Sequence, residues 1–182
     1  ADLRNTVREA AFMQSVGNPE IEVKTELPEE SIEACFDSRL IGQALTNVIK
    51  NAAEAISGRS GDNLPKGRIR IRLSHENGKA LIDIIDNGIG LPKQERQKLL
   101  EPYMTTREKG TGLGLAIVRK IMEDHNGSIE LLDAPDLAPD ETGAMVRLII
   151  GSPAAEDSTA QAGRAQSGSQ SETREQVTSH GL

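Results

Sequence analysis

The hydrophobic positions in the first part of the chain change from a helical to a strand-like spacing and back again. A helical spacing predicts a first helix over residues 3–17. Aliphatic and charged side chains then alternate over residues 21–27, which indicates a half-buried strand, and residues 32–36 look like its short neighbour. Asp37 is suited to cap the long helix that follows, because its side chain can accept from free backbone amides. The apolar stripe of that helix consists of Ile41, Ala44, Leu45, Val48, Ala52 and Ile56.

The second part of the chain predicts a hairpin followed by further helices and strands. Arginine and aliphatic residues alternate over residues 68–73, and the Asn77-Gly78 pair is a preferred hairpin turn. The strand after this turn, over residues 79–85, should therefore pair antiparallel with the strand before it. The remaining predicted elements are a short helix over 92–100, a helix over 114–124, and strands over 128–132 and 144–150.

Together these elements predict an α+β two-layer sandwich, in which a mixed, mostly antiparallel sheet carries its helices on one face. Strands with one charged and one apolar face need cover on one side only, so the other face is expected to be wet. Arg68, Arg70 and Arg72 would lie on that wet face. A doubly wound parallel sheet is the alternative, and it fits less well because it would bury these arginines.

The composition of this chain of 182 residues changes near its C-terminus. From residue 152 onward Val177 and Leu182 are the only large aliphatic residues, and such a segment cannot bury enough surface to offset its ordering entropy. We therefore expect one folded domain over residues 1–151 and a disordered tail over 152–182, although a linker to a further domain would have the same composition. The chain begins at Ala1 within a helical pattern, which suggests a piece of a longer protein.

Charge and composition argue against several classes of function. The net charge of −7, with two phenylalanines, one tyrosine and no tryptophan, suits neither a phosphate backbone nor stacked bases, so we expect no nucleic-acid partner. The single cysteine, Cys35, rules out a disulfide framework and a multi-thiolate metal site, and it makes the cytoplasm the default location. No stretch approaches the roughly 20 apolar residues of a membrane helix. The G-x-x-x-x-G-K-[ST] loop and the H-R-D and D-F-G motifs do not occur.

Asn47 and Asn51 lie four residues apart on the long helix and therefore share one face beside its apolar stripe. Asparagine is a poor interior helix residue because its carboxamide competes for backbone hydrogen bonds. A polar face turned to solvent would explain the pair. Alternatively, the neutral oxygens of the two side chains are suited to bind Mg²⁺ or to contact a phosphate group.

A second candidate is the sequence Asp86-Asn87-Gly88-Ile89-Gly90, which directly follows a predicted strand. Strand alternation puts Asp86 on the face that meets the helices, where a carboxylate is costly unless hydrogen-bond donors surround it. A ligand amino group could be such a donor, and Gly88 and Gly90 would let a flat heterocycle lie against the backbone. A tight turn capped by an aspartate is the common alternative.

A third candidate is the glycine-rich sequence at the start of the helix predicted over 114–124. Bare backbone amides and the positive end of a helix dipole converge there and favour an anion, although glycines also permit close helix packing. The polar segment before it, over 101–109, carries Arg107 and Lys109 and suits either a mobile lid over phosphates or a solvated loop. The glycine-rich residues are Gly110, Thr111, Gly112, Leu113 and Gly114.

Taken in order and spacing, these three features resemble the ATP-binding catalytic domain shared by sensor histidine kinases, gyrase-type ATPases and the Hsp90 and MutL families, the GHKL superfamily. The similarity covers about residues 2–150. The local sequences NVIKNAAEAI, DNGIGLP and EPYMTTREKGTGLGLAIVRKIMEDHNG look most like nitrogen-regulation sensor kinases of the NtrB/NtrY type. The resemblance implies a Bergerat-type ATP-binding fold, ATP and Mg²⁺ as cofactors, and a place in a two-component phosphorelay.

The resemblance also implies roles for individual residues. Asn51 would be the Mg²⁺ ligand and Asn47 its neighbour on the phosphate side, and both would be catalytic. Asp86 would accept a hydrogen bond from the adenine amino group. The purine slot, the phosphate-binding backbone and the lid would be formed by Gly88, Ile89, Gly90, Thr106, Arg107, Lys109, Gly110, Thr111, Gly112, Leu113 and Gly114.

Two positions depart from the pattern of the family. Glu54 stands where many histidine kinases carry a phosphate-binding lysine, so Lys50, Arg107 or Lys109 would have to substitute for it. Ala144 stands where the last strand often has a threonine near the adenine.

Phosphoryl transfer needs positioning and charge neutralisation more than covalent help from the protein. The resemblance places a water-activating carboxylate of related hydrolases one turn before the metal-binding asparagine, whereas this chain has Asn47, which cannot take a proton. A histidine nucleophile needs less activation than water, so we predict a kinase that passes the γ-phosphoryl group of Mg-ATP to a histidine. The alternatives are an independent GHKL-type ATPase and a non-catalytic ATP-binding regulatory module, which Glu54 would favour.

No phosphoacceptor motif of the H-E-x-x-x-P type occurs in the chain. The acceptor histidine is therefore expected on a dimerisation domain of the same kinase, and the chain alone should bind ATP but scarcely turn it over. A cognate response regulator would receive the phosphoryl group next. We expect a homodimeric parent, a monomeric fragment, and a cytoplasmic location, which would be the cytoplasmic part of the sensor if the parent is membrane-bound.

Overall fold

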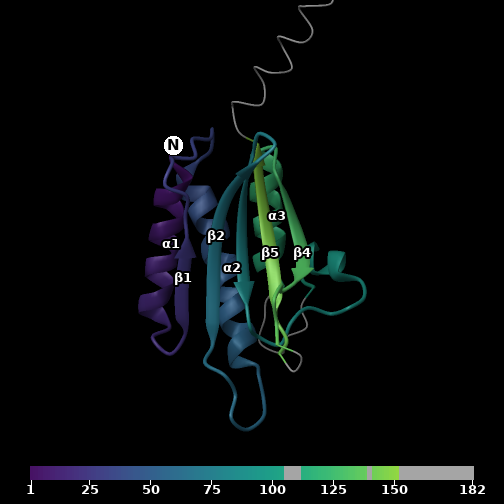
Figure 1. The fold of residues 1–182 in the computed structure, drawn as a ribbon. Coiled ribbons are helices and arrows are strands. Elements are labelled where there is room, and N and C mark those ends of the chain that lie inside the picture. The colour runs from purple at the N-terminus through teal and green to yellow at the C-terminus, as the bar shows by residue number, and fades with distance from the viewer. Residues whose placement is uncertain (105–111, 139–140, 152–182) are drawn as a thin grey trace, which may run out of the picture.

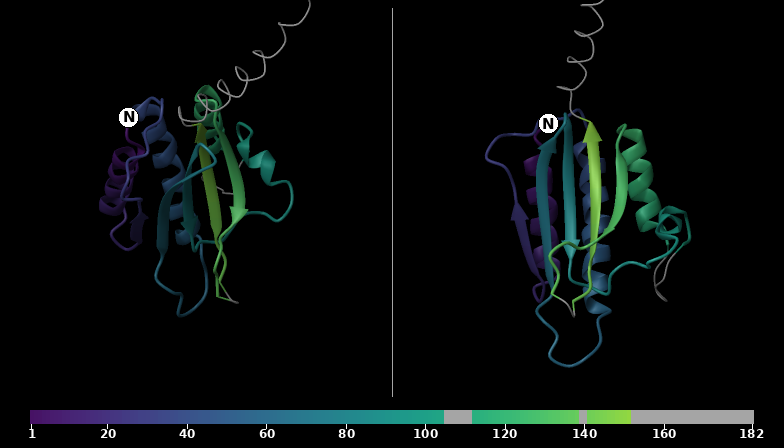
Figure 2. Two further views of the ribbon diagram at one scale, coloured as in Figure 1. Left: turned by 45° about the horizontal axis from the view of Figure 1, so that its top comes forward. Right: turned by 45° about the vertical axis from the view of Figure 1, so that its right-hand side comes forward.

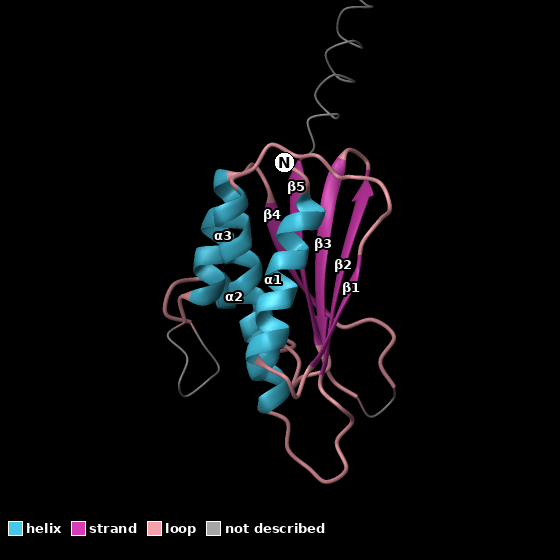
Figure 3. Ribbon diagram, turned by 90° about the vertical axis from the view of Figure 1, so that its left-hand side faces the viewer, coloured by secondary structure: helices cyan, strands magenta, loops and turns pink. Residues whose placement is uncertain are grey.

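The computed structural model describes residues 1–104, 112–138 and 141–151. Within these residues, a five-stranded sheet carries the three α-helices on one of its faces (Figure 1 and Figure 3). This arrangement confirms the predicted α+β two-layer sandwich. In chain order the elements are α1 (Leu3–Gly17), β1 (Glu22–Glu26), α2 (Ser38–Ser57), β2 (Arg68–Glu76), β3 (Lys79–Asp86), the 3₁₀ helix η1 (Arg96–Leu100), α3 (Gly114–Asp124), β4 (Ser128–Asp133) and β5 (Ala144–Gly151).

The strands lie in the order β1-β2-β3-β5-β4, side by side in the right-hand view of Figure 2. The β1–β2 pair is parallel and the other three pairs are antiparallel, as the mixed, mostly antiparallel prediction requires. The predicted hairpin turn between β2 and β3 is confirmed, because Asn77 and Gly78 have φ values of 50° and 72°. This order makes β3 the central strand, so Asp86 at its end lies in the middle of the sheet.

The long helix α2 is the centre of the helical layer. Asp37 caps it as predicted, and its carboxylate accepts from the backbone nitrogens of Arg39 at 2.9 Å and Leu40 at 3.2 Å. The predicted apolar stripe of α2 is buried against α1, α3 and the sheet. Burial of that stripe fixes the rotation of the helix, and therefore the direction in which its polar face points. The largest side chains that are fully buried include Leu3, Ile41, Leu45, Ile49, Ile71, Ile82, Ile84, Met122, Leu148 and Ile150.

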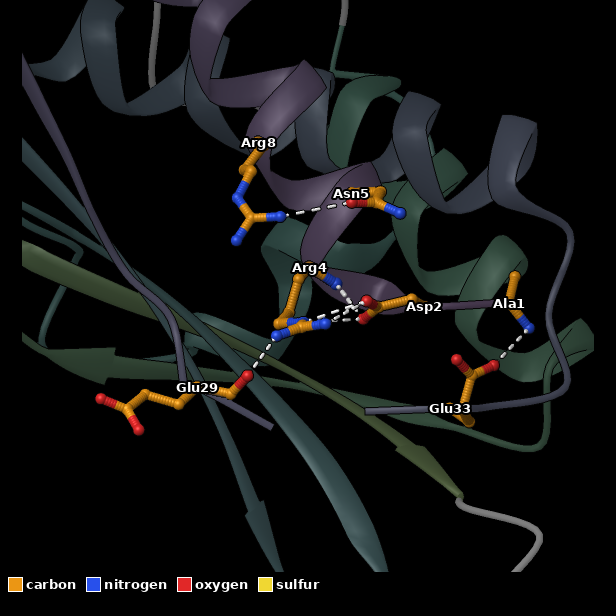
Figure 4. A network of polar contacts seen from close by, with 7 residues as sticks. All are labelled: Ala1, Asp2, Arg4, Asn5, Arg8, Glu29 and Glu33. Carbon is orange, nitrogen blue, oxygen red and sulfur yellow. Dashed lines mark hydrogen bonds and ion pairs between the residues drawn. The ribbon is translucent and has the colours of Figure 1, made fainter. Parts of the chain in front are cut away.

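The strand predicted over residues 32–36 does not form. This segment instead lies along the first residues of α1, where Leu3 N donates to Ile32 O at 3.0 Å and a single β-bridge joins Asp2 to Glu33. Asp2 also caps α1 and binds the side chain of Arg4, whose guanidinium donates to the carbonyl of Glu29 (Figure 4). Backbone bonds to the start of α1 therefore take the place of the expected sheet partner.

The short helix predicted over residues 92–100 is only partly confirmed. A 3₁₀ helix covers Arg96–Leu100, and Glu95 before it has a left-handed φ of 55°. A left-handed residue interrupts an α-helix, so the chain between Pro92 and Glu95 stays irregular. Leu100 is buried and anchors this segment to the core next to α3.

The sheet face away from the helices is less exposed to water than predicted. Strand register aligns Glu26, Arg72, Asp83, Arg147 and Glu130 in one row of alternating charge across all five strands. Asp83, at the centre of the row, is only 1% exposed. The part of this face beside the row is covered by a small apolar cluster of Ile85, Ala134 and Met145. The expectation of a wet face is therefore only partly confirmed: Arg68 is exposed and Arg70 and Arg72 are partly exposed, but the pattern of alternation does not show how neighbouring side chains cover one another.

Candidate functional site

A cavity of about 400 Å³ opens between α2, the ends of β3 and β5, and the start of α3. Asp86 lines it from β3 and Asn51 from α2, so the two side chains on which the sequence-based assignment depends share one cavity. Asn47 also lines it. Apolar side chains form much of the remaining wall, among them Val48, Ala52, Ala55, Ile84, Leu91, Leu115 and Val146.

Helix α2 contributes the polar wall of the cavity. Asn47, Lys50, Asn51 and Glu54 lie three and four residues apart, so they form a polar stripe beside the buried one. The asparagine pair is half-buried, as expected for a stripe at the border of the core. Among the residues that the structure describes, Lys50 is the one cation in the lining, and it lies one turn from Glu54. Helical spacing alone therefore brings the predicted carboxamides and one positive charge to the same wall.

Asp86 is the carboxylate at the inner wall of the cavity. It is 6% exposed and follows Ile82 and Ile84, both fully buried, on the face of β3 that meets the helices. Its Oδ1 accepts from the backbone nitrogen of Gly88 at 2.8 Å. The prediction that Asp86 lies on the face of the sheet that meets the helices is thus confirmed. The alternative explanation, a tight turn capped by an aspartate, is present as well.

The turn after Asp86 packs directly on α2. A Cβ on Gly88 would lie 2.6 Å from both the carbonyl carbon and the Cβ of Ala55, so only glycine fits without a shift. Ile89 N donates to Ala55 O at 3.1 Å and holds the two segments together. Ile89 and Gly90 line the cavity, whereas Gly88 is not among its lining residues. Of the three residues predicted to form a slot for a flat ring, Ile89 and Gly90 thus line the cavity, and the lack of a side chain at Gly88 serves the contact with α2.

The glycine-rich segment meets the cavity where α3 begins. Gly112, Leu113 and Gly114 line the cavity, and α3 starts at Gly114 as predicted. Gly112 has a left-handed φ of 71°, and a Cβ at this position would lie 2.5 Å from the carbonyl carbon of Tyr103. A Cβ on Gly114 would lie 3.6 Å from Asn51 Nδ2, so the helix start and the metal-ligand candidate are adjacent. The other predicted residues of the lid and phosphate loop fall outside the described residues: Thr106, Arg107, Lys109, Gly110 and Thr111.

The sequence patterns did not identify the residues that hold the turn after Asp86 in place. Asn87 is 5% exposed and uses its carboxamide to bind two backbone atoms of the segment that starts β2. Thr142 Oγ1 donates to Gly88 O at 2.7 Å, and Gly143 lies against the carbonyl oxygen of Asp86. Asn87 occupies the first variable position of the D-x-G-x-G motif, so the motif does not indicate a role for it. Thr142 comes from a loop more than fifty residues away, and no local pattern indicates its contact.

Comparison with known proteins agrees with this geometry. Residues 36–154 match the family described as "Histidine kinase-, DNA gyrase B-, and HSP90-like ATPase". The nitrogen regulation protein NtrY of Azorhizobium caulinodans is 52% identical over 149 residues, which are 82% of this chain and 19% of that protein. The sensory histidine kinase/phosphatase NtrB of Rhodobacter capsulatus is 37% identical over 54% of this chain and 30% of its own length.

Two solved structures have the same fold. The mycobacterial sensor histidine kinase MprB superposes with a TM-score of 0.71 at 28% identity, over 84% of this chain and 97% of that one. The catalytic domain of the histidine kinase ThkA gives a TM-score of 0.66 at 30% identity, over 83% of this chain and 93% of that one.

The fold, the cavity and the matched sequence define an ATP-binding domain, and the chain belongs to the histidine kinase-, DNA gyrase B- and HSP90-like ATPase family. Within this family it is a sensor histidine kinase ATP-binding catalytic domain of the NtrB/NtrY type. The chain spans about a fifth of the length of its NtrY relative. Within the described ranges, no helix combines the length and the apolar character needed to cross a bilayer.

Proposed function

We propose that this chain binds ATP together with Mg²⁺ and passes the γ-phosphoryl group to a histidine on a dimerisation domain of the same kinase. The observation that carries the proposal is the single cavity lined by both Asp86 and Asn51. A carboxylate buried to 6% exposure suits a ligand amino group, and a carboxamide oxygen suits a cation that accompanies phosphates. One nucleotide has both of these chemical groups.

At the base end, Asp86 would accept a hydrogen bond from the exocyclic amino group of adenine. Ile89 and Gly90 line the same cavity as Asp86 and would contact a face or an edge of the ring. Because Asp86 presents only acceptors when ionised, a guanine carbonyl at the same place would be repelled. The proposal therefore includes a preference for adenine over guanine nucleotides.

At the phosphate end, Asn51 would hold Mg²⁺ and the start of α3 would donate backbone amides. Mg²⁺ in nucleotide sites commonly takes one or two protein oxygens and completes its shell with phosphates and water, so a single carboxamide suits it. No group of three or more histidine, cysteine or acidic residues forms a metal cluster within 1–104, 112–138 and 141–151. When bound, the ion would neutralise negative charge on the phosphates. Lys50 would add a further positive charge from α2.

In the proposed reaction an imidazole nitrogen of the acceptor histidine attacks the γ-phosphorus. A P–N bond forms, the bond from the γ-phosphorus to its bridging oxygen breaks, and ADP leaves with that oxygen. The residues of this chain orient the nucleotide rather than form covalent bonds. Asn47 supports kinase over hydrolase activity because its carboxamide cannot take a proton from water.

The partners and the location of the whole protein are part of the proposal. The acceptor domain and a cognate response regulator would act before and after this domain, in a homodimeric parent, whereas the chain alone would be monomeric. Use of ATP as substrate supports a cytoplasmic location for the domain. The folded unit would end near residue 151, with residues 152–182 as a tail.

Thermal unfolding with ATP, ADP and GTP, each with and without Mg²⁺, tests the binding part of the proposal. A ligand at about one hundred times its Kd adds roughly 2.7 kcal/mol of stability, which such an assay detects readily. We expect Mg-ATP to raise the Tm, Asp86→Asn to abolish the rise, and Asn51→Ala to remove its dependence on magnesium. An unchanged ATP affinity in Asp86→Asn would refute the base assignment, and an Asn51→Ala affinity that still rises with magnesium would refute the metal assignment.

Phosphoryl transfer is tested by mixing the chain with an NtrY-type dimerisation domain and ATP labelled at the γ-phosphate. Label on the histidine of that domain is expected, and it should disappear with Asp86→Asn. A folded chain that binds ATP but labels nothing would indicate a non-catalytic module. Steady hydrolysis by the chain alone that is lost in Asn47→Ala would indicate an ATPase instead.

A further inference from the structure

Asn87 is a buried polar residue whose carboxamide oxygen and nitrogen both form hydrogen bonds. Its Oδ1 accepts from Arg68 N at 2.7 Å, and its Nδ2 donates to Lys66 O at 3.0 Å. Its backbone nitrogen also donates to Arg68 O at 3.3 Å. All of these partners are main-chain atoms at or just before the start of β2, so they are present whatever side chains stand there. Asn87 therefore fixes the end of β3 to the beginning of β2.

The turn that contains Asn87 is held on two further sides. Toward α2, Gly88 packs on Ala55, and Ile89 N donates to Ala55 O at 3.1 Å. Toward β5, Thr142 Oγ1 donates to Gly88 O at 2.7 Å. These contacts restrain the backbone after Asn87, whereas the carboxamide of Asn87 restrains the turn toward β2. Without that carboxamide, the turn would keep its links to α2 and β5 but only one backbone bond to β2, from Asn87 N to Arg68 O, and it could rotate about these contacts.

Such a rotation would act on the carboxylate of Asp86. Its Oδ1 accepts from Gly88 N at 2.8 Å, so the direction of the carboxylate follows the backbone of the turn. Asn51, in contrast, is carried by the middle of α2, whose position is set by burial of its apolar stripe. A movement of the turn would therefore change the base end of the cavity and leave the phosphate end in place.

We propose that Asn87 is a positioning residue for base recognition, which holds the carboxylate of Asp86 at the angle that distinguishes an amino group from a carbonyl group on the purine. This inference rests on the proposed function, because it presumes that Asp86 receives the base. A positioning role differs from a purely structural role in one measurable respect. Loss of the carboxamide changes the preference between purines in a positioning role, whereas a loss of stability alone would leave that preference unchanged.

The test compares ATP with inosine triphosphate, which carries a carbonyl group in place of the adenine amino group. Calorimetry or competition binding with each nucleotide and Mg²⁺, well below the Tm of every variant, gives the preference as a ratio of Kd values. For Asn87→Ala we expect about tenfold weaker ATP binding, because a misdirected acceptor loses a charge-assisted hydrogen bond. The affinity for inosine triphosphate should not fall, because the repulsion between the carboxylate and its carbonyl group is relieved. The preference for ATP should therefore fall by at least the same factor.

Two further variants separate positioning from folding. Asn87→Asp keeps the volume and the acceptor for Arg68 N but loses the donor to Lys66 O, so it should lower the preference by a smaller factor than Asn87→Ala. Thr6→Ala is the matched control, because Thr6 is also a buried polar residue, 7% exposed, and lies on α1 away from the cavity. It should lower the Tm and leave the preference within twofold of the parent chain.

The outcomes distinguish failure of the positioning role of Asn87 from failure of the proposed function on which it rests. If the parent chain shows no preference for ATP, the proposed function fails together with the inference. If the parent chain prefers ATP and both folded Asn87 variants keep that preference, the inference alone is wrong. If Asn87→Ala does not fold, Asn87→Asp decides by the same ratio, and failure of both variants to fold would assign Asn87 to folding and overturn the positioning role.

Discussion

Replacement of Asp83 by alanine should separate the stability of this domain from its nucleotide site. Asp83 lies at the centre of β3 on the face away from the helices, and its carboxylate is shared by two arginines. Arg147 of β5 contributes bonds of 2.7 and 3.0 Å, and Arg72 of β2 contributes bonds of 2.8 and 3.3 Å. One carboxylate therefore joins the three central strands β2, β3 and β5.

The expected loss of unfolding free energy depends on the burial of Asp83 and on the solvent exposure of the two arginines that remain. Removal of one partner of a buried ion pair costs about 3–5 kcal/mol, because the other charge is left without compensation. Here Arg72 and Arg147 have 39% and 27% of their side chains exposed, so water would compensate part of their charge. We therefore expect a loss at or just below the lower limit of that range, about 2–3 kcal/mol, which corresponds to roughly 5–10 °C in Tm for a domain of this size.

Chemical and thermal unfolding measure this loss, and ATP binding is measured on the same samples. Asp83 points away from the cavity that Asp86 lines, so the Kd for Mg-ATP should stay within twofold. Glu130→Ala is the matched control, because Glu130 belongs to the same charge row but is exposed, and it should change stability by less than about 0.5 kcal/mol. A loss for Asp83→Ala no larger than that of the control, or a parallel loss of ATP affinity, would refute the reasoning.

Three further predictions concern pH, packing and the tail. Burial raises the pKa of the Asp83 carboxyl, but hydrogen bonds from Arg147 and Arg72 outweigh burial and hold that pKa below its usual value. The stability that the ionised Asp83 contributes is therefore present above about pH 4 and is lost as the pH falls through the lowered pKa. In acid titrations the Tm of the parent chain should consequently fall more steeply than that of Asp83→Asn. Gly88→Ala should destabilise by about 1–3 kcal/mol in urea unfolding because its Cβ would meet the Ala55 backbone at 2.6 Å, whereas Gly17→Ala, with nothing within 4 Å, serves as a neutral control. Truncation after Gly151 should leave Tm and ATP affinity nearly unchanged, and a drop in either would show that the tail contributes to the fold.

Local sequence patterns were sufficient for the elements whose signals are complete within themselves. The long helix α2 has its cap at Asp37 and its apolar stripe within twenty residues, and the hairpin between β2 and β3 has its turn at Asn77 and Gly78. The same local patterns placed Asp86 on the inner face of β3. Because α2 and β3 then pack on each other, these predictions were enough to bring Asn51 and Asp86 to one cavity.

Features that depend on partners distant in the chain could not be predicted in this way. Residues 32–36 have the composition of a strand, but backbone bonds from Leu3 N to Ile32 O and from Ala34 N to Ala1 O hold them at the start of α1. Asn87 has its partners about twenty residues earlier, at Lys66 and Arg68, and their position depends on how β2 pairs with β3. The alternation of side chains indicates which face a residue occupies, but it does not identify the residues that lie beside it.

The two aspartates of β3 show what such neighbours decide. Asp83 and Asp86 are three residues apart, so they point to opposite faces of one strand, and both are almost completely buried. The cross-strand neighbours of Asp83 are arginines on both sides, and its charge is therefore used to hold the sheet together. Asp86 stands opposite Ile69 on β2 and lines the cavity instead. A buried carboxylate in a strand thus indicates a binding site only when the residues on the adjacent strands leave it facing a cavity, and this can be judged only once the register is known.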